Sequence, residues 1–403
     1  MVILNTCSVR EKAVQKVYAR LGELKRLKAK REELVLGVVG CMAQLEGVKI
    51  LKKAPYVNLI AGPQKGHVMG NLVEETIRTH SPAIDLRMDE DPEPLETAHV
   101  LRESPWRAGV TISEGCNRRC TFCVVPLTRG TERDRESRNI VTEVRRLVDH
   151  GYIEIVLLGQ TVNSYRDPCD RDFTFAKLLR ELAGIGGLKR IRFTSPHPND
   201  FTDELLDVMV SCPQVCNHVH LPVQSGSTRI LRLMRRGYTI ERYLETVRKL
   251  HGAARPISLS TDIIVGFPGE TDKDFRDTLS LLDEVQFDNV FSFKYSPRPN
   301  TAALTLPDET PDDEKGRRLR ILQDQQKLIQ YNKNAAYLER AVEVLAEDKA
   351  RSHFTLAGRT SDNKVVNFDG PEALLGSIVA VQITGFGANS LKGIWLRQGP
   401  EES

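Results

Sequence analysis

Three cysteines stand close together in the middle of the chain, in the order Cys116-Asn-Arg-Arg-Cys120-Thr-Phe-Cys123. Thiolates suit iron–sulfur clusters, and a four-iron cluster normally takes four protein ligands. Three closely spaced thiolates leave one iron open to a small molecule. The amino and carboxylate groups of S-adenosylmethionine could chelate that iron, so that an electron passing to the sulfonium breaks a carbon–sulfur bond and yields a 5′-deoxyadenosyl radical.

Two other interpretations of these cysteines stay open from the residues alone: a structural zinc site with a remote fourth ligand, or three unrelated buried thiols. Zinc sites usually contain two C-x2-C units, and this segment contains one. Phe122, just before the last cysteine, suits an apolar shield over a solvent-sensitive cofactor. We therefore favour the radical interpretation, with Cys116, Cys120 and Cys123 as the catalytic ligands.

Composition limits the surroundings in which this chemistry would occur. The 403 residues include eight cysteines and carry 57 Lys and Arg against 54 Asp and Glu, for a net charge of +3. That charge is too small to indicate a nucleic-acid partner by itself. No run reaches the roughly 18 apolar residues of a membrane span, and the start lacks signal-peptide features. We expect a cytoplasmic protein with no membrane partner, whose thiols serve metal or redox chemistry rather than disulfides.

The elements around the cysteines alternate between strand and helix patterns over residues 106–331. Strand signals fall at 109–112, 154–158, 190–194, 218–223, 259–265 and 289–295, with amphipathic helical segments such as 140–149, 175–183 and 275–285 between them. Six such repeats predict a parallel sheet curled into a partial (βα)6 barrel with its helices outside. The cysteines follow the first strand, at the end of the barrel where active sites lie.

Smaller domains are expected on either side of this core. Residues 1–78 indicate an α/β N-terminal domain, with strands at 2–6 and 34–40 and a helical pattern over 9–30. Several prolines and acids predict a linker over 79–105. Residues 336–403 contain five short strand patterns, at 342–347, 354–358, 365–368, 378–383 and 394–397, which are typical of a small OB-like all-β barrel.

These motifs resemble the radical S-adenosylmethionine superfamily and, within it, the methylthiotransferases. The resemblance covers nearly the whole chain and is closest to the tRNA-2-methylthio-N6-dimethylallyladenosine synthase branch. It is carried by Glu114-Gly-Cys-Asn117, Cys123-Val-Val-Pro-Leu-Thr-Arg-Gly130, Leu157-Leu-Gly-Gln-Thr-Val-Asn163, His220-Leu-Pro-Val-Gln-Ser-Gly-Ser227, Asp262-Ile-Ile-Val-Gly-Phe-Pro-Gly-Glu-Thr271 and Ser296-Pro-Arg-Pro299. The tail resembles the TRAM domain, an RNA-binding appendage.

The resemblance implies a tRNA substrate that carries N6-isopentenyladenosine at position 37, beside the anticodon, and a product with a methylthio group at C2 of that base. A flavodoxin-type or ferredoxin-type protein would supply the electron, and we expect a monomer. The alternatives are sibling methylthiotransferases, which act on threonylcarbamoyl-adenosine in tRNA or on an aspartate of a ribosomal protein. An alternative of another class is a non-catalytic RNA-binding protein with a vestigial cluster.

Cys7, in Asn5-Thr-Cys-Ser-Val-Arg-Glu-Lys-Ala13, and Cys41, in Gly40-Cys-Met-Ala-Gln44, match two ligands of the family's auxiliary four-iron cluster. By composition alone they could be ordinary buried cysteines. In the family a third cysteine comes from a Gly-Cys-Gln-x-Asn segment upstream of the position of Cys7, which this sequence does not contain. We therefore expect two 4Fe-4S clusters, with an incomplete ligand set for the auxiliary one, and an N-terminal domain truncated at its front.

Polar residues after the other barrel strands complete the predicted site. Gln160, Gln224 and Gly266 are expected to line the pocket for S-adenosylmethionine and substrate, with Gly266 allowing its backbone to approach the adenine closely. A plain loop is the alternative at Gly266. The remaining cysteines, at positions 169, 212 and 216, match no ligand of the family and are expected to be structural.

Overall fold

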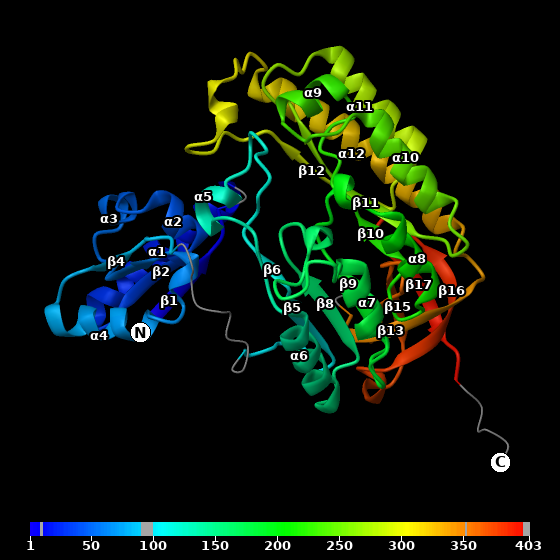
Figure 1. Cartoon of the computed structure of the whole chain (residues 1–403), viewed down its shortest axis with the longest axis horizontal. Coiled ribbons are helices and arrows are strands. Elements are labelled where there is room, and N and C mark those ends of the chain that lie inside the picture. The colour runs from blue at the N-terminus through cyan, green and yellow to red at the C-terminus, as the bar shows by residue number, and fades with distance from the viewer. Residues whose placement is uncertain (9–10, 90–99, 351–352, 398–403) are drawn as a thin grey trace. The chain divides into compact units, whose positions relative to one another are not determined.

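The computed structural model describes residues 1–8, 11–89, 100–350 and 353–397, and forms two compact units (Figure 1). The first unit comprises Met1–Glu96, Glu114–Arg133 and Ser296–Leu306, and the second comprises Thr97–Ser113, Asp134–Tyr295 and Pro307–Ser403. The segment with the three central cysteines therefore belongs to the same unit as the N-terminal domain. Sequence order does not reveal this grouping, because the unit combines segments that are far apart along the chain.

The first unit is built on a parallel sheet in the order β1 (Val2–Thr6), β2 (Leu36–Gly40), β3 (Leu59–Ala61) and β4 (Ala83–Asp85). Its strands are connected by α1 (Glu11–Lys30), α2 (Cys41–Glu46), α3 (Lys49–Lys53) and α4 (Met69–Thr79). Strands β2 and β3 consist of small and apolar residues that are mostly buried, as is usual when both faces of a parallel sheet are covered.

Strand β4 lies in the segment 79–105, which the sequence predicts to be a linker. Three residues are too few for a period-two pattern to be recognised, and β4 owes its conformation to its pairing with β3. The expected linker residues 90–99, and residues 9 and 10 of the helical pattern, lie outside the described part of the chain. The domain boundaries themselves stay predictions.

The second unit contains six parallel strands in chain order, divided between two sheets. The sheets are β5 (Arg107–Thr111), β8 (Glu154–Leu158), β9 (Arg190–Phe193) and β10 (His218–His220), β11 (Ser258–Val265), β12 (Asn289–Lys294). The partial barrel predicted from the sequence is thus confirmed, with one difference. Among the described residues the two sheets are joined by one isolated bridge, between Ile191 of β9 and Val215, which lies three residues before β10 begins.

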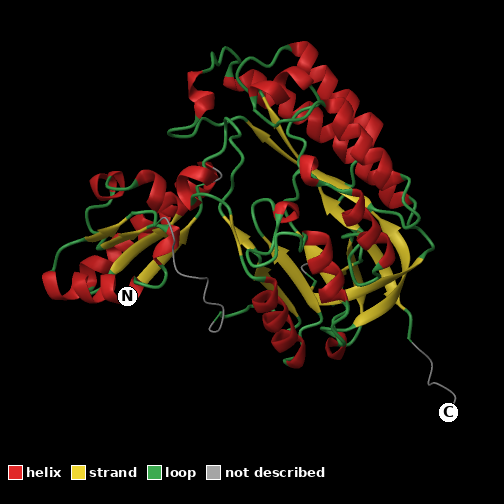
Figure 2. Cartoon of the chain, in the orientation of Figure 1, coloured by secondary structure: helices red, strands yellow, loops and turns green. Residues whose placement is uncertain are grey.

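Helices accompany the strands of the barrel (Figure 2). They are α6 (Ser137–Asp149), α7 (Phe175–Ala183), α8 (Asp203–Ser211), α9 (Thr228–Leu233), α10 (Ile240–His251), α11 (Asp272–Val285) and α12 (Asp312–Ala335). Their apolar faces and the alternate residues of the strands form one large hydrophobic core. Within the described ranges, none of the helices combines the length and the apolar character needed to cross a bilayer.

Short elements complete this part of the chain. Strands β6 (Ser113–Glu114) and β7 (Arg133–Asp134) pair with each other, and α5 (Val125–Arg129) lies between them in sequence. The 3-10 turns are η1 (Pro63–Lys65), η2 (Val162–Ser164), η3 (Pro198–Asp200), η4 (Ala302–Thr305) and η5 (Glu372–Leu374).

The tail folds into a closed barrel in the order β13 (Ala341–Lys349), β14 (Leu356–Arg359), β15 (Val365–Asp369), β17 (Leu391–Trp395) and β16 (Ile378–Phe386). This confirms the small all-β domain. The last strand begins at Leu391 instead of residue 394, because Gly393 has to lie against β16. A Cβ there would approach the Val381 side chain to 2.5 Å, and a glycine in this position hides the alternating apolar pattern.

A turn of the tail barrel, residues 359–364, lies beneath the amino-terminal ends of β9 to β12. Arg190 and Arg192 each donate a 2.7 Å hydrogen bond to a main-chain carbonyl of this turn, and Ser258 donates another of 2.7 Å. Lys364 forms a 2.8 Å ion pair with Asp288, and both side chains are nearly buried. The turn therefore closes the end of the partial barrel opposite to the carboxyl ends of its strands.

Candidate active site

Cys116, Cys120 and Cys123 lie on the loop between β6 and α5, and all three are partly exposed. The loop begins at Gly115, whose φ of +74° is left-handed and whose Cβ would lie 2.0 Å from a backbone oxygen. Only glycine fits this position. The main-chain N–H of Cys116 donates to the carbonyl of Gly130 over 3.1 Å, which closes the loop.

Backbone N–H groups point at two of the three sulfur atoms. The N–H of Arg118 donates to Sγ of Cys116 over 3.4 Å, and the N–H of Val125 donates to Sγ of Cys123 over 3.5 Å. Hydrogen bonds to the sulfur ligands are one of the features by which proteins tune iron–sulfur clusters. The three sulfur donors on one loop therefore fit a metal–sulfur cluster, although no group of three or more His, Cys, Asp or Glu residues among those described is arranged closely enough to hold a single metal ion.

Charged side chains hold the two ends of this loop together. Glu114 lies 3.6 Å from a guanidinium nitrogen of Arg129 and 3.4 Å from one of Arg133. Gln64 of the N-terminal domain accepts from the N–H of Asp89 over 3.0 Å and donates weakly to the carbonyl of Arg129 over 3.5 Å. Helix α5 also packs against α2. The loop is thereby attached to the N-terminal sheet within the first unit.

The structure brings Cys7 and Cys41 to the same edge of the N-terminal sheet. Cys7 follows β1 directly and is exposed, and Cys41 begins α2 directly after β2 and is 8% exposed. The last residues of these strands, Thr6 and Gly40, are partners in the parallel register. Both cysteines therefore follow the carboxyl ends of adjacent strands. Their role as ligands stays a prediction.

Gln160 and Gln224 follow β8 and β10, at the carboxyl ends of strands as expected. The Oε1 atom of Gln160 is buried and accepts no hydrogen bond from the described residues. Gln224 is 8% exposed and has a φ of +77°, which is unusual for a residue with a side chain. Its backbone forms two 2.9 Å hydrogen bonds with β11, one through its N–H and one through its carbonyl. Such backbone strain is typical of functional sites, and sequence patterns do not reveal it.

Gly266 has a different structural reason to be glycine from the one predicted. Its φ is +65°, and a Cβ would lie 2.3 Å from Cγ of Lys315 on α12. Its N–H donates to the carboxylate of Glu270 over 2.9 Å. The position is therefore explained by packing within the protein, and its contact with a cofactor stays a prediction. Phe122 lies on the cysteine loop and is partly buried.

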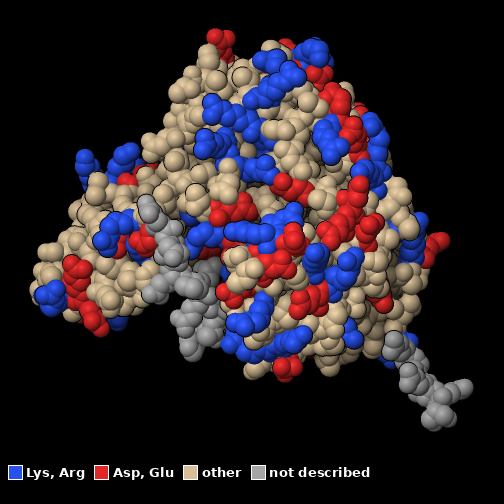
Figure 3. All heavy atoms as spheres, in the orientation of Figure 1, with Lys and Arg blue, Asp and Glu red and all other residues tan. Residues whose placement is uncertain are grey.

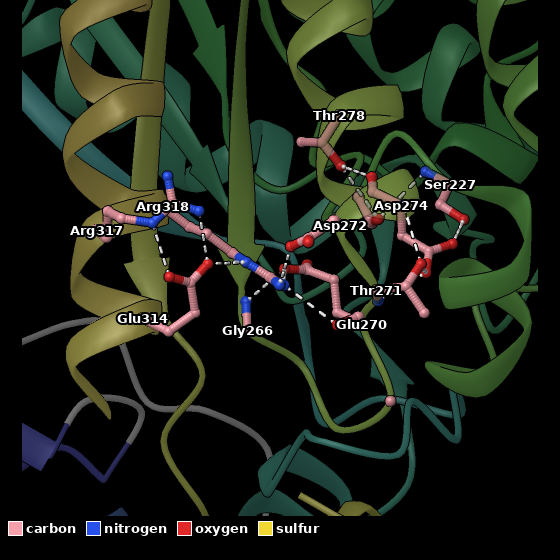
Figure 4. A network of polar contacts seen from close by, with 12 residues as sticks. Ser227, Gly266, Glu270, Thr271, Asp272, Asp274, Thr278, Glu314, Arg317 and Arg318 are labelled. Carbon is pink, nitrogen blue, oxygen red and sulfur yellow. Dashed lines mark hydrogen bonds and ion pairs between the residues drawn. The ribbon is translucent and has the colours of Figure 1, made fainter. Parts of the chain in front are cut away.

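A network of ion pairs supports the turn that contains Gly266 (Figure 4). Arg318 of α12 bonds to Glu270 at 2.7 Å, Asp272 at 2.8 Å and Glu314 at 2.9 Å. Burial raises the pKa of Glu270, against the opposite effect of the Gly266 N–H and of Arg318. Sequence reasoning missed Arg318, because no local pattern relates it to a turn some fifty residues earlier.

Asp274 stabilises the first turn of helix α11, which begins next to this network. It forms a capping box with Thr271 and accepts hydrogen bonds from Ser227 and Arg229. Burial alone would raise the pKa of Asp274, but these donors outweigh it and hold the pKa below the usual range. The carboxylate therefore stays charged over the whole physiological range.

A partial parallel barrel whose first strand leads to a loop with three thiols defines a radical S-adenosylmethionine enzyme, and the Radical SAM superfamily model matches residues 110–282. Residues 1–62 match Uncharacterized protein family UPF0004, and residues 336–396 match the TRAM domain. A solved radical S-adenosylmethionine methyltransferase, TsrM from Kitasatospora setae, superimposes with a TM-score of 0.53 at 17% identity, over 75% of this chain and 65% of that chain. This likeness concerns the fold alone.

Comparison with curated relatives identifies the family more narrowly than the superfamily model does. The chain is 45% identical over 397 residues to a tRNA-2-methylthio-N(6)-dimethylallyladenosine synthase of Solibacter usitatus, which covers 98% of this chain and 88% of the relative. It is 47% identical over 387 residues to the synthase of the same name from Moorella thermoacetica, over 95% of this chain and 87% of the relative. The chain belongs to the tRNA-2-methylthio-N(6)-dimethylallyladenosine synthase family. Neither the sibling methylthiotransferases nor a non-catalytic RNA-binding protein is favoured by these names.

Proposed function

We propose that the chain adds a methylthio group to C2 of N6-isopentenyladenosine at position 37 of tRNA. The observation that carries this proposal is the family relationship over nearly the whole chain, together with the three-thiol loop of residues 116–123. The C–H at C2 of adenine is not acidic, so acid–base catalysis offers no route to it. A radical reaction does.

Cys116, Cys120 and Cys123 would hold the cluster that binds S-adenosylmethionine. Such a cluster, when bound with S-adenosylmethionine on its open iron, supplies a 5′-deoxyadenosyl radical that can remove the hydrogen from C2. The N–H groups of Arg118 and Val125 would donate hydrogen bonds to two of the sulfur atoms that ligate the cluster. Gln160, with its buried and unbonded Oε1, would offer an acceptor to the cosubstrate or substrate.

Cys7 and Cys41 would contribute to a second 4Fe-4S cluster, which carries the sulfur to be transferred. Their position after paired residues of adjacent strands supports this role, since the tips of two neighbouring strands can share a cluster. We further propose a flavodoxin-type or ferredoxin-type electron donor, a cytoplasmic location and a monomeric enzyme. Acidic and basic side chains are intermixed on the face shown in Figure 3, so RNA binding would depend on local groups.

The decisive experiment complements a deletion strain with the full-length gene and measures tRNA nucleosides by mass spectrometry. We expect the methylthio-isopentenyl nucleoside to reappear, and its continued absence would contradict the assignment. In vitro, the anaerobically reconstituted and reduced protein should release 5′-deoxyadenosine from S-adenosylmethionine. Cys120→Ala should abolish this release and lower the iron content, whereas Cys169→Ala, at a cysteine outside both predicted ligand sets, should change neither.

A further inference from the structure

One face of the β10–β12 sheet carries polar and aromatic side chains that the proposed chemistry has not used. Successive side chains of a strand point to opposite faces, and one set packs with the helices in the hydrophobic core. That set includes Val219, Leu259, Ile263 and Val290. His220, Asp262 and Phe291 occupy the alternate positions of the same strands, so they point to the inner face. The three residues are called the inner-face patch below.

The parallel register places the members of this patch side by side. Asp262 is the register partner of Phe291, and His220 is the partner of Ser260. The rings of His220 and Phe291 meet edge to face, with centroids 5.5 Å apart. The Nε2 atom of His220 lies 3.4 Å from the Asp262 carboxylate. An aromatic ring, an imidazole and a carboxylate are thus adjacent on rigid strands.

Hydrogen bonds hold the imidazole of the patch in one orientation. Ser260 Oγ lies 2.9 Å from Nδ1 of His220 and 2.9 Å from Nε2 of His218. Burial lowers the pKa of His218 to about 3, so its ring is neutral at working pH. His220 is therefore held on one side by Ser260 and on the other by Asp262, which leaves the carboxylate with further capacity to accept a hydrogen bond.

Phe291 is 45% exposed, although it belongs to a strand that is paired with β11 along its whole length. Ser292, the next residue, points the other way and accepts a 3.3 Å hydrogen bond from Gln323 of α12. On β8, Leu158 also occupies an inner-face position and is 36% exposed. Phe291 therefore presents a partly exposed ring directly beside His220 and Asp262.

We propose that the inner-face patch binds the N6-modified adenine of the substrate RNA. This inference rests on the proposed function and names the residues that would read the base. Single-stranded RNA is recognised by splaying out a base, stacking it on an aromatic side chain and bonding its edge. Phe291 provides the stacking surface, and Asp262 accepts the one hydrogen that an alkylated N6 retains. His220 positions Asp262.

This orientation is compatible with reaction at C2. Asp262 lies three residues before the end of β11, so the N6 edge of a base bound there points into the barrel. N6 and C2 lie on the same edge of adenine, one on each side of N1, so a base whose N6 is bound to Asp262 can present C2 further along β11, toward the carboxyl ends of the strands. The turn 359–364 closes the opposite end, which limits how deeply the base can enter.

The test compares two anticodon stem-loop RNAs, a modified RNA with N6-isopentenyladenosine at position 37 and one with an abasic residue there, because Phe291 and Asp262 would contact the ring and the N6 hydrogen of the base. Binding to the full-length protein is measured by fluorescence anisotropy. We expect the wild-type protein to prefer the modified RNA. Phe291→Ala should weaken binding of the modified RNA by roughly 5- to 150-fold, the range that corresponds to loss of one base-stacking contact. Asp262→Asn should also reduce the preference. Ser292→Ala, on the other face of β12, is the matched control and should behave as the wild type.

Phe291→Leu separates stacking from folding, because it keeps an apolar side chain and removes the ring. Its thermal midpoint should stay near that of the wild type while its preference for the modified RNA falls. Unchanged preference in Phe291→Leu and Asp262→Asn, an equal loss for both RNAs, or no preference in the wild type would overturn the inference. A wild-type protein that prefers the modified RNA but forms no methylthio product would contradict the proposed function alone.

Discussion

Replacing Arg192 by methionine should strongly destabilise the attachment of the tail barrel to the core. Its guanidinium donates to the carboxylate of Glu154 over 3.1 Å and to two main-chain carbonyls of the 359–364 turn over 2.7 and 3.1 Å. The Glu154 side chain is 0% exposed. Arg192→Met leaves that carboxylate buried without its cation, which typically costs about 3–5 kcal/mol.

The assay is urea unfolding followed by tryptophan fluorescence, for which the chain is well suited. Its two tryptophans are Trp106, which packs against Gly376 of the tail barrel, and Trp395 within that barrel. With a slope of roughly 2–3 kcal/mol per M, a loss of about 3–5 kcal/mol should lower the midpoint of the first transition by about 1–2.5 M. Arg242→Met removes an exposed ion pair with Glu245 and serves as the control, with an expected cost below ~1 kcal/mol.

The double variant Arg192→Met/Glu154→Gln tests the reasoning itself. Removing both charges leaves no buried carboxylate without a partner, so this variant should be less destabilised than the sum of the two single variants. A shift in Arg192→Met no larger than that of the Arg242→Met control would refute the assignment of a buried, stabilising ion pair. Strictly additive effects would refute the direct coupling of the two residues.

Three further outcomes can be measured by the same unfolding assay. Gly266→Ala should cost about 1–3 kcal/mol, since its φ is +65° and its Cβ position is filled, whereas Gly70→Ala, with nothing within 4 Å, should be neutral or slightly stabilising. Thr271→Ala removes the helix cap and should lower the free energy of unfolding by about 1 kcal/mol. A change below ~0.3 kcal/mol would contradict the capping box. The lowered pKa of Asp274 implies stability that is present above its unfolded pKa of about 3.9 and is lost as the pH falls through the folded pKa. The free energy of unfolding of Asp274→Asn should therefore lie below that of the wild type near neutral pH, and this difference should shrink between about pH 5 and pH 2. A difference that does not change with pH would exclude this linkage.

Sequence reasoning succeeded where the physical cause is local. The spacing of Cys116, Cys120 and Cys123 is short enough to indicate a cluster without knowledge of the fold, and family membership agrees with the chemistry inferred from it. Strands such as β8 and helices such as α7 lie at the predicted residues, because a continuous apolar run and an amphipathic repeat are properties of the segment itself.

The limits of this reasoning are clearest at Gly266 and Gln224. Gln224 has a left-handed backbone that is held by β11, which lies some forty residues later in the chain. At Gly266 the space for a Cβ is filled by Lys315, which is also distant in sequence. Strand β4 was missed because its three residues are extended only through pairing with β3. The six barrel strands divide into two sheets because of the pairing between neighbouring strands. This pairing cannot be predicted from the pattern of any one segment.

By itself, the sequence determined the chemistry available to this protein and the order of its elements, because ligand spacing and hydrophobic periodicity act over a few residues. Only the tertiary structure decided which of these elements meet. It joined the cysteine loop to the N-terminal unit, placed the 359–364 turn under the barrel strands and set His220, Asp262 and Phe291 side by side. Such contacts depend on strand register and packing between distant segments, which are properties of the folded chain as a whole.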